Sequence, residues 1–124
     1  MRLLLYFSDS ETAGRKLLEA VYKRIPPEET EVHRDMKSLS DRFRRPRGEL
    51  RVAVILCSSR EELSQIVSLG PLISDLRILL LLPDRERETI ARGHTLYPRF
   101  LSFVDESFEE VGAVLGKMLA RSGS

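Results

Sequence analysis

The stretch that decides the fold is Leu50–Ser59, which reads Leu-Arg-Val-Ala-Val-Ile-Leu-Cys-Ser-Ser. Every residue from Val52 to Cys57 is apolar or carries sulfur, and β-branched residues are prominent among them. A strand this uniformly apolar offers water no polar face, so it is predicted to be buried on both sides. That is the position of a central strand in a parallel sheet with helices above and below it.

Four other segments are predicted to be strands. Arg2–Phe7 and Arg77–Pro83 are apolar without polar alternation, which again indicates burial on both faces. Thr30–Asp35 has charged residues around its one aliphatic side chain and is predicted to be an edge strand, where charge discourages pairing with another molecule. Arg99–Val104 is the last strand of the chain.

Helical segments are predicted between the strands, because apolar residues recur there at spacings of three and four. Ser58 with Glu61, and Ser59 with Glu62, both satisfy the capping-box spacing at the start of the third helix. The stretch from Asp84 to Gly93 is so charged that only a marginal helix is expected there. The other helices are expected over Glu11–Arg24, over part of Lys37–Arg47, and after Asp105–Ser107.

This alternation of strand and helix predicts an α/β fold with parallel strands and right-handed crossovers. The expected architecture is a three-layer αβα sandwich around a five-stranded parallel sheet of order 2-1-3-4-5, the flavodoxin-like order. That order places the most apolar strands at the centre and the charged second strand at an edge. We expect a single domain over residues 1–121, with residues 122–124 as a tail.

Composition limits the function classes. A net charge of +1 gives no general attraction to nucleic acid or to an anionic membrane. The single cysteine rules out an internal disulfide and suits a reducing, cytoplasmic compartment. The longest apolar runs are too short to span a bilayer, and the first residues are too short for a signal peptide. No cofactor is expected, because no glycine-rich phosphate-binding motif is present.

Polar and reactive residues gather where strands are predicted to end, which is where open α/β sheets bind ligands. Cys57 is either a nucleophile favoured by a helix N-terminus or a small buried residue that closes a strand. The serines either bind an anion or cap helices, and the acids either hold a cation or face water. The candidate strand-end pocket consists of Ser8, Asp9, Ser10, Cys57, Ser58, Ser59, Asp84 and Asp105.

A basic segment, Arg42–Arg51, surrounds Phe43. Its arginines can contact the phosphates of a nucleic acid or an acidic partner. No DNA-binding motif accompanies them, so a solvated surface, open to a partner, is the favoured interpretation and nucleic-acid binding is not expected.

The layout resembles the receiver domains of two-component signalling, the CheY-like fold, over nearly the whole chain. Asp9-Ser10-Glu11 is similar to the acidic cluster after the first strand of a receiver. Val54–Cys57 is similar to the third strand leading to the phosphoacceptor, and Phe103–Asp105 to the fifth strand with its following helix.

The departures from the receiver pattern lie at its catalytic positions. Cys57 falls where a receiver has the phosphoacceptor carboxylate, and Ser10 falls where it has a second acid for Mg²⁺. Asp84, after Pro83, stands near the place of a hydroxyl, and Asp105-Glu106 stands where a lysine is needed. Phosphoryl transfer depends on positioned positive charge, so the resemblance implies a degenerate receiver that is not phosphorylated on aspartate and holds no metal.

The leading hypothesis is therefore a non-catalytic, receiver-like regulatory domain of bacterial-type signalling. It would act through contact with a protein partner, or as a homodimer, using the face that the resemblance assigns to helix four, strand five and helix five. The alternatives are a small-ligand or anion-binding protein of flavodoxin-like fold and, third, a Cys57-dependent thiol enzyme. The candidate partner surface consists of Arg85, Arg87, Ile90, Arg92, Tyr97 and Arg99.

Overall fold

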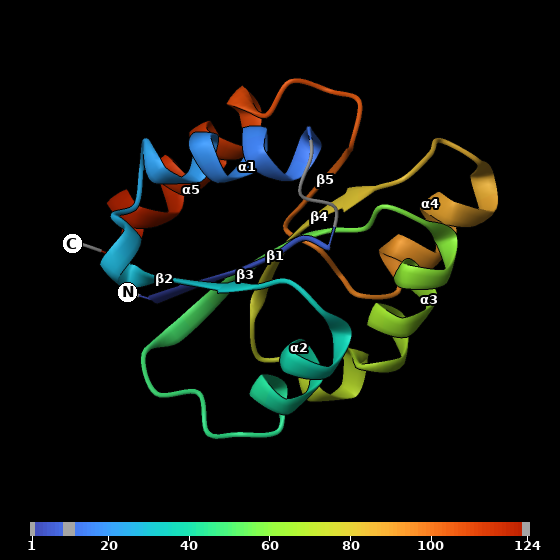
Figure 1. The fold of residues 1–124 in the computed structure, drawn as a ribbon, viewed down its shortest axis with the longest axis horizontal. Helices are drawn as coiled ribbons and strands as arrows, with labels where there is room; N and C mark the ends of the chain where they lie inside the picture. Colours follow the sequence, from blue (N-terminus) through green and yellow to red (C-terminus); the bar gives the residue numbers. More distant parts are fainter. Residues whose placement is uncertain (1, 9–11, 123–124) are drawn as a thin grey trace.

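A computed structural model describes residues 2–8 and 12–122, with side chains as far as Met118, and it shows one sheet between two layers of helices (Figure 1). The strands are β1 (Arg2–Tyr6), β2 (Thr30–His33), β3 (Leu50–Leu56), β4 (Arg77–Leu82) and β5 (Phe100–Phe103). The helices are α1 (Ala13–Tyr22), α2 (Met36–Phe43), α3 (Arg60–Ser68), α4 (Arg87–His94) and α5 (Glu109–Ser122), with short 3-10 turns η1 (Pro27–Glu29) and η2 (Gly70–Leu72).

The sheet has the predicted order, β2-β1-β3-β4-β5, and all of its strand pairs are parallel. Leu5 of β1 lies beside Val54 of β3, which in turn lies beside Leu79 of β4. The residues from Val52 to Leu56 have no exposed surface at all, which confirms that β3 is buried on both faces. Val32 of the edge strand β2 remains partly exposed.

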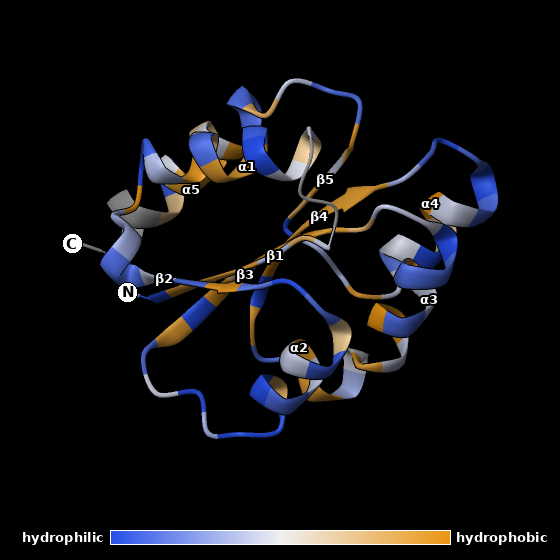
Figure 2. Ribbon diagram, in the orientation of Figure 1, coloured by the Kyte–Doolittle hydropathy of each residue, from blue (hydrophilic) through white to orange (hydrophobic). Residues whose placement is uncertain are grey.

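Each face of the sheet packs against its own set of helices. Figure 1 shows α1 and α5 on one side and α2, α3 and α4 on the other, and Figure 2 shows apolar residues concentrated along the strands between them. Alternate residues of a strand point to opposite faces, so β3 contributes Val52 and Val54 to one core and Ala53 and Ile55 to the other. Burial of these two cores is the main stabilising contribution to the fold.

Some helix ends differ from the prediction. α1 begins at Ala13 after Thr12, whose side chain makes no capping hydrogen bond, so Ser8 is not its cap; Asp9 and Ser10 lie outside the described residues. At α3 the Ser59 hydroxyl accepts from the Glu62 N–H at 3.1 Å, so Ser59 with Glu62 is the pair that caps this helix. α5 begins only at Glu109, because Asp105 and Glu106 form a turn after β5. It extends through Ser122, which the sequence reading placed in the tail.

Within the described part of the chain, no helix combines the length and the apolar character that crossing a bilayer requires.

Candidate functional site

The carboxyl ends of β1 and β3 meet at one rim of the sheet, where Ser8 and Ser58 face each other. Their hydroxyl oxygens are 3.3 Å apart. β1 and β3 are followed by helices on opposite faces of the sheet, so this is the crevice where ligands of open α/β sheets bind. The structure therefore brings together two of the strand-end residues that the sequence singled out.

The carboxylate of Glu62 connects the residues at the ends of these two strands. Its Oε2 accepts hydrogen bonds from the Ser8 hydroxyl at 2.6 Å and from the Tyr6 hydroxyl at 3.0 Å. Its Oε1 accepts from the Ser58 N–H at 2.9 Å and from the Ser58 hydroxyl at 3.2 Å. A carboxylate of the protein itself thus already binds the donors of Ser8 and Ser58, which the sequence pattern made candidates for binding an anion; Ser10 lies outside the described residues.

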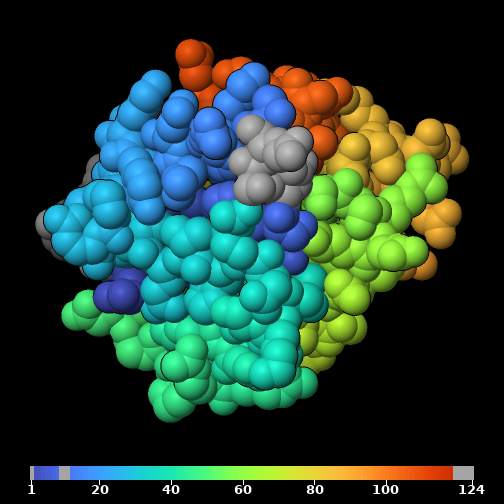
Figure 3. All heavy atoms as spheres, in the orientation of Figure 1, coloured from blue at the N-terminus to red at the C-terminus, as the bar shows by residue number. Residues whose placement is uncertain are grey.

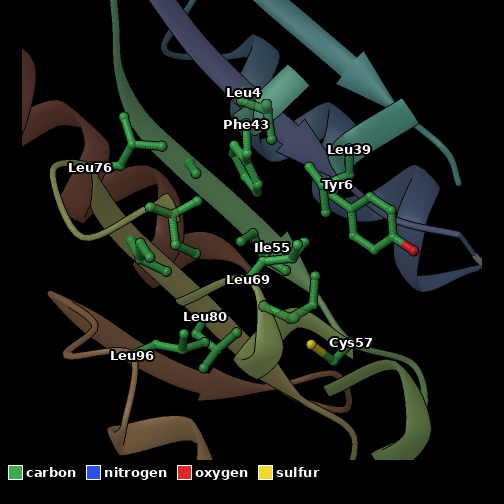
Figure 4. Close-up of a cluster of buried hydrophobic side chains, with 14 of the residues drawn as sticks. Leu4, Tyr6, Leu39, Phe43, Ile55, Cys57, Leu69, Leu76, Leu80 and Leu96 are labelled. Atoms are coloured by element: carbon green, nitrogen blue, oxygen red, sulfur yellow. The ribbon is translucent and has the colours of Figure 1, made fainter. Parts of the chain in front are cut away.

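Tyr6 links this crevice to the core. Its ring is buried in the cluster beneath α2 and α3, and its hydroxyl lies at the margin of that cluster (Figure 4). Burial and the nearby Glu62 carboxylate raise the pKa of Tyr6, so the phenol stays protonated and donates to Glu62. Sequence reasoning assigned Glu62 only to helix capping; the tyrosine partner lies too far away in the chain for a local pattern to indicate it.

Cys57 lies beneath the rim rather than on it. Its side chain has no exposed surface, and its N–H donates to the Leu81 carbonyl at 2.9 Å within the sheet. Burial, together with the negative charge of Glu62, raises the pKa of the Cys57 thiol well above its ordinary value. Of the two interpretations of Cys57, its burial favours a small residue that closes a strand, and the raised pKa gives the thiol-enzyme alternative no support.

The two strand-end acids that the structure describes, Asp84 and Asp105, each pair with an arginine. Arg60 donates to Asp84 at 2.8 Å, and this bond, with that from the N–H of Glu86, lowers the pKa of Asp84 to about 2. Arg85 donates to Asp105 at 2.7 Å, which lowers the pKa of that carboxyl as well.

These pairings bear on the expectation that the acids would converge. Arg85 also donates to Glu106 at 2.6 Å and lies 4.4 Å from the centre of the Phe103 ring. Among the residues that the structure describes, no three His, Cys, Asp or Glu side chains gather as metal ligands would; Asp9 is outside that set. Asp84 and Asp105 instead join the loops after β4 and β5 to neighbouring arginines.

The basic segment is used largely inside the molecule. Arg42 is only 8% exposed, and its Nε donates to Glu31 of β2 at 2.8 Å. Its Nη1 and Nη2 donate to the carbonyls of Pro46 and Arg47 at 3.0 and 3.1 Å, so one guanidinium joins α2, β2 and the loop after α2. In Figure 3 this segment, coloured cyan to green, covers the lower part of the face shown.

Arg47 makes a second internal connection. It donates to Asp75 through Nε at 3.0 Å and Nη2 at 3.1 Å, and it also binds the carbonyls of Phe43 and Leu72. The interpretation of a solvated surface is therefore wrong for Arg42 and Arg47, because both hold the loop between α2 and β3 in place. Arg44 and Arg45 do point to solvent.

Glu31 gives this network a predicted pH dependence. The carboxylate faces Arg42, Arg2 and His33, and the hydrogen bonds from these groups outweigh burial and lower the pKa of Glu31. Because the pKa of Glu31 is lower in the folded state than in the unfolded state, its ionised carboxylate stabilises the fold. This contribution to the free energy of unfolding is complete above about pH 4.3 and disappears as pH falls through the folded-state pKa. Urea unfolding of the parent and Glu31→Gln should therefore show a stability difference that is largest at neutral pH and shrinks in acid. A difference independent of pH would contradict the assignment.

The candidate partner surface divides into engaged and exposed side chains. Ile90 packs against the core, Arg92 donates to Ser64 of α3 at 2.6 Å, and Arg85 is held by its two acids. Arg87, Tyr97 and Arg99 are exposed, and Tyr97 is 88% exposed with a backbone φ of +52°. The exposed part of this surface thus lies at the start of α4 and in the loop between α4 and β5.

No protein family model matches the chain, and a search of curated proteins finds no match to it.

Proposed function

We propose that the protein is a non-catalytic, receiver-like regulatory domain of bacterial-type cytoplasmic signalling, and that it acts through contact with a protein partner without phosphorylation on aspartate. The observation that carries this proposal is the state of the rim after β3. The position that corresponds to a receiver's phosphoacceptor holds a buried thiol, Cys57, and the neighbouring Ser8 and Ser58 donate to the Glu62 carboxylate. A phosphoryl group brought there would face negative charge.

The residues after β5 support the same proposal. Asp105 and Glu106 stand where a receiver has its lysine, and Arg85 from the loop after β4 is bound to both. That guanidinium is already neutralised by two carboxylates. Phosphoryl transfer needs positive charge available for the transferred group, and Arg85 does not supply it here.

The proposal predicts that a small-molecule phosphodonor with Mg²⁺ leaves the intact mass of the protein unchanged. A genuine receiver domain treated in parallel is the positive control and should gain one phosphoryl group. Addition of a phosphoryl group to any aspartate of this chain would contradict the proposal. The Glu62→Gln variant should also remain unmodified, because removing that charge does not create a phosphoacceptor.

The contact surface is proposed to be the face formed by α4, β5 and α5, through its exposed residues Arg87, Tyr97 and Arg99. Exposed charges such as those of Arg87 and Arg99 affect the specificity and the rate of association with a partner more than the affinity for it. A second copy of the chain is one possible occupant of this face, and light scattering of the parent and Arg87→Glu would test for a dimer.

The alternative of a small-ligand or anion-binding protein gains no support from the rim. Ser8, Tyr6 and the Ser58 N–H, which would bind an anion, all donate to Glu62.

A further inference from the structure

A groove lies at the amino ends of β4 and β5, at the opposite end of these strands from the Glu62 crevice. It has a volume of about 650 Å³ and is bounded by η2 on one side and by the loop between α4 and β5 on the other. Its apolar lining includes Pro71, Leu76 and Leu96. It is also lined by Arg77, Tyr97 and Arg99. Figure 4 shows Leu76 and Leu96 at the far end of the core cluster from Tyr6 and Cys57.

The charge around this groove is positive and uncompensated. Asp75 is the acidic residue among the described residues that line it, and its carboxylate is held by two hydrogen bonds from Arg47. These bonds, with a smaller effect of Arg51, lower the pKa of Asp75 and keep it ionised within a cationic surrounding. Arg77 and Arg99 are exposed, and neither side chain forms a hydrogen bond or ion pair with the described part of the chain.

Tyr97 stands at the edge of the groove in an unusual state. The residue is 88% exposed, and its φ of +52° lies in the left-handed region, which non-glycine residues rarely adopt. Tyrosine and arginine are among the residue types that contribute most to binding energy at protein interfaces.

We propose that this groove binds an acidic segment of a protein partner that carries an apolar anchor residue. Carboxylates of the segment pair with Arg77 and Arg99, the anchor packs against Leu76 and Leu96, and the Tyr97 ring covers it. This inference rests on the proposed function of partner contact and names the chemistry of the partner. The apolar lining favours a peptide over a nucleic acid, as does the absence of an overall basic charge.

Comparison with a second cavity shows why we assign the acidic segment to this groove. The second cavity has a volume of about 690 Å³ and lies between α1 and α5. Its lining has three basic residues, Lys16, Lys23 and Arg24, and four acidic ones, Glu19, Asp105, Glu106 and Glu109. Arg85 binds Asp105 and Glu106, but an acidic segment would still meet the carboxylates of Glu19 and Glu109. The groove at Arg77 and Arg99 has no such balance.

The test begins with selection of a phage-displayed library of random peptides on the whole, immobilised chain. The expected winners carry several Asp or Glu residues around a Leu, Ile or Phe. A fluorescein-labelled copy of one winner is then titrated by fluorescence polarisation against the parent, the double variant Arg77→Glu/Arg99→Glu, and Tyr97→Gly. Each variant should bind about tenfold more weakly or worse.

Two controls make the result specific. Arg44→Glu/Arg45→Glu changes the net charge by the same amount on another surface and should bind the peptide as the parent does. Tyr97→Gly should melt at the same temperature as the parent or higher, because glycine adopts positive φ without strain. Loss of binding without loss of stability therefore identifies Tyr97 as a contact residue.

The remaining outcomes overturn the proposal. It is overturned if the selection yields no peptide or if the selected peptides lack acidic residues. It is also overturned if the Arg44→Glu/Arg45→Glu control loses as much peptide binding as the Arg77→Glu/Arg99→Glu variant. A labelled single-stranded oligonucleotide that displaces the peptide and depends on Arg77 and Arg99 to the same degree would assign the groove to nucleic acid. Binding that depends on Arg87 instead would overturn the groove and leave the proposed function intact, whereas phosphorylation of the chain would overturn the receiver proposal and leave the groove intact.

Discussion

Replacing Arg42 with methionine is expected to lower the free energy of unfolding by about 3 kcal/mol, because it removes one member of a buried ion pair. Methionine fills similar space but leaves Glu31, whose side chain is only 18% exposed, without its main partner. It also leaves the carbonyls of Pro46 and Arg47 without their donor. Urea unfolding at neutral pH, followed by circular dichroism, measures the loss.

The matched control is Arg45→Met, three residues further along the chain. Arg45 is exposed, so its replacement should change stability by no more than about 0.5 kcal/mol. Arg42→Lys should recover only part of the loss, because a single ammonium group cannot reach Glu31 and both carbonyls as the guanidinium does. Equal, small effects of Arg42→Met and Arg45→Met would show that the buried pair contributes little.

A double-mutant cycle tests the pair directly, with Arg42→Lys in place of Arg42→Met if the methionine variant does not fold. Removing the carboxylate charge as well, in Glu31→Gln/Arg42→Met, should cost less than the sum of the two single changes by about 1–3 kcal/mol. Strict additivity at these two positions would contradict direct coupling.

Gly93→Ala is expected to destabilise the protein by about 1–2 kcal/mol, although alanine is the better helix former. A Cβ atom at Gly93 would lie 3.1 Å from the side chain of Leu82 and 3.3 Å from those of Leu80 and Leu101. Leu80 and Leu82 have no exposed surface, so neither can move aside without disturbing the core. α4 can approach the sheet this closely because residue 93 has no side chain.

Gly112→Ala in α5 is the matched control and should change stability in the opposite direction. Its Cβ would lie 3.6 Å from Nε of Arg24 and 3.8 Å from the Ala20 carbonyl, both ordinary contacts. The gain in helix propensity then remains, and the free energy of unfolding should rise by up to about 1 kcal/mol. Thermal unfolding of the two variants beside the parent measures the direction of each change in stability. Stabilisation by Gly93→Ala would refute the packing argument.

The arginines illustrate how far sequence reasoning extends to the candidate sites. In the chain, Arg42, Arg44, Arg45 and Arg47 form one basic run and look alike. Arg42 follows Leu39 by three residues and so shares the buried stripe of α2, a signal of inward orientation that local sequence does contain. Its partner Glu31 lies on β2 and becomes its neighbour only when α2 packs against the edge of the sheet.

Glu62 shows the same limit at the rim. Its spacing from Ser59 predicted a cap, and the cap exists. The hydrogen bonds from Tyr6 and Ser8 come from the end of β1 and the loop after it, more than fifty residues earlier in the chain. No pattern within α3 indicates that its carboxylate connects the ends of two strands.

The order of the sheet, its burial and its two helical layers follow from the sequence by itself. Apolar character along a strand is a local property, and a strand such as β3 with no polar face has a stable position only at the centre of a sheet. Only the tertiary structure decides which charges are neutralised and which remain free. Ion pairs form between residues far apart in the chain, so Arg42 and Arg47 became internal connections while Arg77 and Arg99 were left exposed beside an apolar groove.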